Sequence, residues 1–264
     1  MERDRNEGGS DIGLDLARDM GDESPSSLRD AAPDILSPID DSAPVSGHTI
    51  ASGSRTSAMD SPEHDWKLAR DIVRPAFRPV GTQGLAIEDI QRDNLAQHAM
   101  QKHAQPLLDV GPGGLPVVYA IPAGGFDVVV NGEHLLSWGI EPVELQDAAM
   151  RNLAAWAADA PWTNEVSGER RLISSDTGDG LDAVRILAPD VMSYLATELG
   201  QGGARVLVGL PERHLLAAAS LRANDPGFAA MFAEFVVEQS GGADEPIDRR
   251  VFEIVDGRLV EFSG

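Results

Sequence analysis

One polar segment of this chain carries residue types that can do chemistry. It reads DTGDGLD, with Asp176, Asp179 and Asp182 at intervals of three and glycines between them. Carboxylate oxygens in such a loop can surround a hard cation, although the calcium loop of EF-hands places its ligands at alternate positions. In the other interpretation, Asp179 or Asp182 caps the following helix, where negative charge suits the helix dipole. The sequence favours the cap over the metal site.

Two further side chains could join these carboxylates in a catalytic site. Arg185 follows the acidic segment and could clamp an anion, and His214 is a residue type that titrates near neutral pH, as a proton carrier requires. If Asp179, Asp182, Arg185 and His214 converge on one cleft, an aspartate acting as base or metal ligand would complete a hydrolase site. A lone histidine is more often structural, so the hydrolase is the alternative hypothesis.

Other chemical signatures are missing from the sequence. There is no cysteine, which excludes a thiol nucleophile and a thiolate metal site. The glycine-rich stretches 111–114 and 200–203 lack the Lys-Ser/Thr pair of a phosphate loop, and no G-x-S-x-G motif surrounds a serine. We therefore expect no cofactor, and we favour a non-catalytic protein-binding or adaptor module over an enzyme.

The net charge of the chain restricts the classes of molecule that it can bind. The 264 residues carry a formal net charge of −22, which repels nucleic-acid phosphates and anionic lipid headgroups and favours cationic partners. No stretch approaches the roughly 20 apolar residues of a membrane span, and no signal peptide is recognisable at the N-terminus. We expect a cytoplasmic protein that binds an unidentified protein and neither nucleic acid nor membranes.

The elements that position these residues lie in one part of the chain. Residues 1–62 are rich in Ser, Asp, Gly and Pro and contain no aromatic residue, which predicts a disordered acidic arm. Residues 63–264 are expected to form a single domain. Strands and helices alternate irregularly there, and two hairpins are expected. This order predicts an α+β fold on a largely antiparallel sheet with packed helices.

Individual elements follow from hydrophobic spacing and turn residues. The segment 215–221 is uniformly apolar and could be strand or helix. Helices are expected from Trp66 to the residues before Pro75, and at 87–101, 133–138 (closed by Gly139), 142–160, 182–199 (with a break at Pro189) and 226–238. Strands are expected at 115–121, 126–130, 170–174, 205–208, 251–255 and 258–262.

Three segments together resemble a known family. They read DGLDAVRIL from Asp179, HLLSWGIEPVELQDAAMRNLAAW from His134, and ARVLVGLPERHLLAAASL from Ala204. In this order they are similar to the YtpQ-like (DUF1444) family of uncharacterised bacterial proteins, over roughly residues 117–262. Leu181 stands where the family usually has an aromatic residue. The resemblance implies an α+β fold and no assigned catalytic residues.

Overall fold

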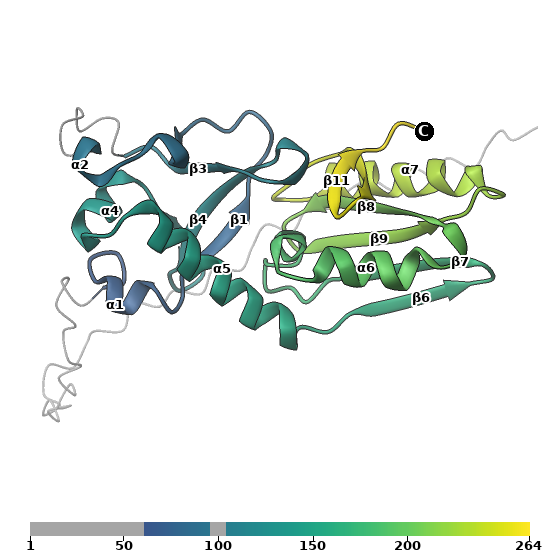
Figure 1. Ribbon diagram of the computed structural model, residues 1–264, viewed down its shortest axis with the longest axis horizontal. Helices are drawn as coiled ribbons and strands as arrows, with labels where there is room; N and C mark the ends of the chain where they lie inside the picture. The colour runs from purple at the N-terminus through teal and green to yellow at the C-terminus, as the bar shows by residue number, and fades with distance from the viewer. Residues whose placement is uncertain (1–60, 96–103) are drawn as a thin grey trace, which may run out of the picture. The chain divides into compact units, whose positions relative to one another are not determined.

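The computed structural model describes residues 61–95 and 104–264 (Figure 1). The chain divides into two units, 1–51 and 52–264, and the expected disordered arm lies almost entirely outside the described residues. The described part is α+β, as predicted from the sequence. It contains two mostly antiparallel sheets where the sequence indicated one.

The first sheet has five strands in the order β1-β4-β3-β2, with β5 paired to β4. All pairs are antiparallel except β2 with β3. Its strands are β1 (Arg74–Phe77), β2 (Leu85–Ala86), β3 (Leu107–Val110), β4 (Pro116–Pro122) and β5 (Asp127–Val129). The predicted hairpin of β4 and β5 is present. Pro75, expected to end a helix, lies inside β1, where it is tolerated because β1 pairs on one side only.

Short helices and one long helix pack on this sheet. Pro142 begins α5 (Pro142–Asp159) as predicted, and Gly139 ends α4 (Gly132–Trp138) with a φ of 68°. Their buried faces meet the sheet in one hydrophobic cluster that includes Leu135, Leu145 and Tyr119. The remaining short elements are α1 (Trp66–Ala69), η2 (Ile87–Asp89), α2 (Arg92–Leu95) and η3 (Pro112–Gly114).

The second sheet is entirely antiparallel, in the order β11-β10-β8-β9-β7-β6. Helices cover both of its faces, α6 and η4 on one and α7 on the other, so every residue of β9 is buried. This explains why β9 shows no alternation in sequence. The strands are β6 (Thr163–Ser167), β7 (Arg170–Ser175), β8 (Arg205–Glu212), β9 (Leu215–Leu221), β10 (Val251–Val255) and β11 (Arg258–Glu261).

The helices that pack on the second sheet differ in part from the prediction. The expected helix 182–199 is two elements, η4 (Ala183–Leu187) and α6 (Val191–Leu199), separated around Pro189. A further short turn, η5 (Gln201–Gly203), follows, and α7 (Pro226–Gly242) is longer than expected. The predicted final hairpin is present, and its turn residues Asp256 and Gly257 both have positive φ, as a type I′ turn requires.

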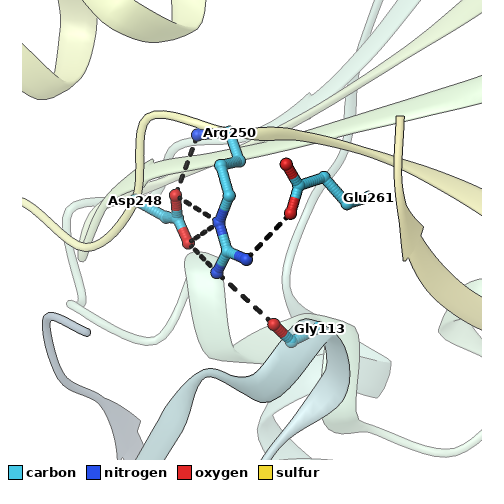
Figure 2. Close-up of polar contacts among 4 residues, drawn as sticks. All are labelled: Gly113, Asp248, Arg250 and Glu261. Carbon is cyan, nitrogen blue, oxygen red and sulfur yellow. Dashed lines mark hydrogen bonds and ion pairs between the residues drawn. The ribbon is translucent and has the colours of Figure 1, made fainter. Parts of the chain in front are cut away.

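Arg250 links the β10–β11 hairpin to η3, the turn between β3 and β4 of the first sheet (Figure 2). Its guanidinium donates to Asp248, at 2.6–3.1 Å, and to Glu261 at 3.2 Å. The same group reaches the carbonyl oxygen of Gly113 in η3 at 3.4 Å. Beside this contact, Phe252 lies so close to Gly113 that a Cβ there would be 2.4 Å from the ring. Only glycine fits this junction.

Replacing Gly113 with alanine therefore tests the junction. Gly113 and Gly114 have similar φ values of 65° and 75°, but a Cβ on Gly114 would meet nothing within 4 Å. Both substitutions introduce the strain of a left-handed alanine, and only G113A adds a clash with Phe252. We expect G113A to lower the free energy of unfolding by about 1–3 kcal/mol more than G114A, measured by urea denaturation. Equal losses would contradict this packing.

A second prediction concerns pH. His134 completes a capping box at the start of α4, with its Nδ1 at 3.2 Å from the backbone N of Asn131 and 2.7 Å from the Asn131 Oδ1. Burial lowers the pKa of His134 from the ordinary value of 6.5. As pH falls below 6.5 the unfolded chain takes up a proton before the folded chain does. The contribution of His134 to the free energy of unfolding is therefore complete above pH 6.5. It declines as the pH falls toward the pKa of His134 in the folded chain.

The substitution His134→Gln keeps a side-chain acceptor and removes the titration. Between about pH 7.5 and about pH 5.5, above the range where most carboxylates titrate, we expect the urea midpoint of the wild type to fall more than that of H134Q. Parallel pH profiles would show that His134 does not contribute.

Candidate functional site

Asp182 is a buried carboxylate with three donors. It accepts from the hydroxyl of Ser175 at 2.7 Å, from the backbone N–H of Thr177 at 3.0 Å and from the Thr177 hydroxyl at 3.1 Å. Asp182 occupies the residue before η4, as the cap interpretation expected, but its side chain makes no capping hydrogen bond. It instead holds the preceding loop in place.

Arg185 is 1% exposed and also has a structural environment. Its Nη1 donates to the carbonyl of Pro161 and to the hydroxyl of Ser175, both at 2.9 Å. Its Nη2 donates to the carbonyls of Ala157, at 2.8 Å, and Ala160. The guanidinium lies 3.7 Å from the centre of the Trp162 ring. Arg185 thus places its charge at the C-terminal end of α5, where the helix dipole favours a cation.

Burial lowers the pKa of Arg185, and the nearby Asp182 opposes this effect. An arginine pKa starts so high that the side chain stays charged. The two groups are joined through Ser175, whose hydroxyl accepts from one and donates to the other. Asp182, Ser175 and Arg185 form what we call the buried network. Its members are unavailable to a substrate.

The other two carboxylates of the acidic segment have different surroundings. Asp179 accepts from the indole N–H of Trp156 at 2.9 Å, and Asp176 is exposed to solvent. Within residues 61–95 and 104–264, no group of three Asp, Glu, His or Cys side chains is arranged to hold a metal ion. Asp182 is engaged by Ser175 and Thr177 and lies outside the cavity that Asp179 lines.

A cavity of about 1160 Å³ contains the remaining candidates. Asp179 and His214 line it, whereas Asp182 and Arg185 do not, so the four predicted residues do not share one cleft. Its walls come from the β4–β5 hairpin, the 176–180 loop, the β8–β9 turn and the C-terminal end of α7. The lining residues are Arg78, Pro122, Gly125, Phe126, Asp127, Gly178, Asp179, Glu212, Arg213, His214, Glu238, Gln239, Gly242, Ala243, Asp244 and Glu245.

The cavity wall is negatively charged. Six carboxylates line it against two arginines and one histidine. Arg213 is engaged already, because it pairs with Asp127 and, at 3.2 Å, with Glu245. Glu212, Glu238 and Asp244 form no ion pair with any described residue. These carboxylates come from the end of β8 and the end of α7, and no local sequence pattern identified them.

Two other lining side chains are notable. Phe126, at the tip of the β4–β5 hairpin, is 67% exposed although it is large and apolar. His214 is half-buried, and its Nδ1 atom has no hydrogen-bond partner among the described residues. The arrangement can bind a cationic, partly apolar ligand, and it offers no nucleophile beside a base.

Comparison with protein-family models, curated proteins and solved structures gives no match. The similarity to the YtpQ-like family therefore stays a prediction. In the described part of the chain, no helix combines the length and hydrophobicity needed to cross a bilayer.

The structural assignment of Arg185 can be tested by its removal. Arg185→Leu leaves the Asp182 charge without its cation and three α5-end carbonyls without a donor, so we expect a loss of about 3–5 kcal/mol in the free energy of unfolding. Arg205→Leu is the control, since Arg205 forms an exposed pair with Glu253 whose loss is expected to cost about 0–1 kcal/mol. Similar losses in the two variants, measured by urea denaturation, would contradict the assignment.

Proposed function

We propose that this protein is a non-catalytic, cytoplasmic protein-binding module, and that its cavity receives a basic segment of a partner protein. The observation that carries the proposal is the convergence of Glu212, at the end of β8, with Glu238 and Asp244, at the end of α7, on one cavity with no basic residue paired to them. The cysteine-free sequence fits a reducing compartment.

Electrostatics supports a basic partner. Opposite potentials across an interface speed association and suppress wrong partners. Because Glu238 and Asp244 are exposed, each contact with a Lys or Arg side chain contributes modestly and is screened by salt. The binding is therefore salt-dependent and relies on several contacts acting together.

Phe126 supplies an apolar contact beside the charges. Aromatic residues are enriched at protein interfaces, where they bury a large area at low cost in side-chain entropy. The long stems of Lys and Arg can pack on such a ring while their charged ends reach the carboxylates. A protein segment satisfies both requirements better than a small cation does.

The hydrolase hypothesis receives less support. It required Asp182 and Arg185 at the same cleft as Asp179 and His214, and the buried network engages the first two elsewhere. Asp179 and His214 alone provide neither the anion clamp nor the metal ligand set of that hypothesis.

The proposal predicts selective binding of a basic peptide. We expect a fluorescent peptide of alternating Lys and Gly to bind the full chain in low salt, and an alternating Glu and Gly peptide not to bind. The double substitution Glu238→Gln and Asp244→Asn is expected to weaken binding about tenfold, measured by fluorescence anisotropy.

The matched control removes the same amount of charge elsewhere. Asp159 and Glu165 are exposed and lie outside the cavity, so D159N/E165Q changes the net charge equally. It should bind the basic peptide as the wild type does. If both double variants lose the same affinity, attraction to overall charge explains the binding and the cavity proposal fails.

A further inference from the structure

The outer face of α7 is unusually apolar. The helix packs Phe232 and Val236 against the second sheet, and the opposite side faces solvent. On that side Met231 is 54% exposed and Val237 is 47% exposed. Figure 1 shows α7 running along one side of the second sheet. Two large apolar side chains are thus held about half-exposed on a rigid element. Glu234 lies between them along the helix, and the Met231 Sδ accepts a hydrogen bond from Arg170 at 3.6 Å.

The charges of α7 are unbalanced. Its only charged residues are Glu234 and Glu238, four positions apart, and like charges at this spacing repel. Glu238 also lies near the C-terminal end, where the helix dipole favours a cation. Asp244 follows just beyond the helix and adds to the same negative region. A cation bound there relieves all three unfavourable interactions.

The apolar face and the cavity are continuous. Glu238, Gln239 and Gly242 belong to α7 and also line the cavity. Val237 precedes Glu238 directly, and Met231 lies about two turns earlier along the helix. A ligand that reaches from the cavity along α7 therefore meets Glu238 and Val237 first, and then Glu234 and Met231.

We infer that the partner segment is a basic amphipathic helix that lies along α7. Its apolar side covers Met231 and Val237, and its Lys or Arg side chains reach Glu238 and Asp244 at the cavity. A helix presents apolar and charged side chains at the spacing that α7 itself has, as in other helix-in-groove complexes. The inference rests on the proposed function and specifies the partner's form.

Charge distinguishes this occupant from two others. A second copy of the chain would bring Glu234 and Glu238 against the same two residues of its partner, and like charges across an interface cost affinity. An anionic membrane surface is repelled by the same carboxylates.

The experiment compares two peptides of identical composition. One places Leu on one side of a helix and Lys on the other, and the second has the same residues reordered so that neither side is apolar. We expect the full chain to bind the amphipathic peptide about tenfold more tightly than the reordered one in fluorescence anisotropy.

The variants locate the contact. The double substitution M231Q/V237Q is expected to weaken binding of the amphipathic peptide about tenfold and to leave binding of the reordered peptide unchanged. The control V80Q/V110Q alters two exposed valines outside α7 and should bind both peptides as the wild type does. Circular dichroism verifies that each variant keeps its fold.

Each other outcome has a distinct meaning. If both peptides bind equally and M231Q/V237Q has no effect, the helical inference fails and the proposed function stands. If neither peptide binds, the proposed function fails as well. If light scattering shows a wild-type dimer that M231Q/V237Q converts to a monomer, a second copy covers α7 and the inference is overturned.

Discussion

The buried guanidinium of Arg185 joins the end of α5 to η4 and to β7, the strand that precedes the acidic loop. Removing such a group from water costs several kcal/mol, so the site must return this energy through contacts. Carbonyls at the end of α5, the Ser175 hydroxyl and the face of Trp162 supply them. Because these groups lie 10 to 28 residues from Arg185 in sequence, the guanidinium joins α5, β7 and η4 to one another.

The same buried network shapes the surface above it. Asp182 holds the backbone N–H and the hydroxyl of Thr177, and that hydroxyl accepts from the N–H of Asp179 at 3.2 Å. Asp179 is thereby fixed in the cavity wall. Across the cavity, Arg213 contacts the carbonyl of Gly180 as well as Asp127, which joins the loop to the β4–β5 hairpin. In the buried network every hydrogen-bonding group except the Nε of Arg185 has a partner among the described residues, whereas the cavity wall keeps carboxylates that lack a cation.

Local signals predicted local structure well. Pro142 and Gly139 marked helix ends correctly, and Asp256-Gly257 marked a hairpin turn, because each acts through its own backbone geometry. The strands β1, β2 and β3 were missed because they have only two to four residues each. The strand β6 was missed because it is exposed along its whole length, which leaves no hydrophobic pattern. The roles of Asp182 and Arg185 depend on partners that no spacing rule specifies. The hydrolase alternative placed Asp182 and Arg185 in one cleft with Asp179 and His214, and the structure instead buries the first two away from the cavity that the other two line.

The central claim is that the cavity wall beside the end of α7 binds a basic protein segment. Backbone amide chemical shifts of the isotope-labelled full chain, followed during titration with the amphipathic Lys and Leu peptide, test it most directly. The account predicts shifts concentrated at Phe126, at Met231 and Val237, and at Glu238 and 242–244, with none along β6. Shifts confined to other elements, or absent at saturating peptide, would contradict it.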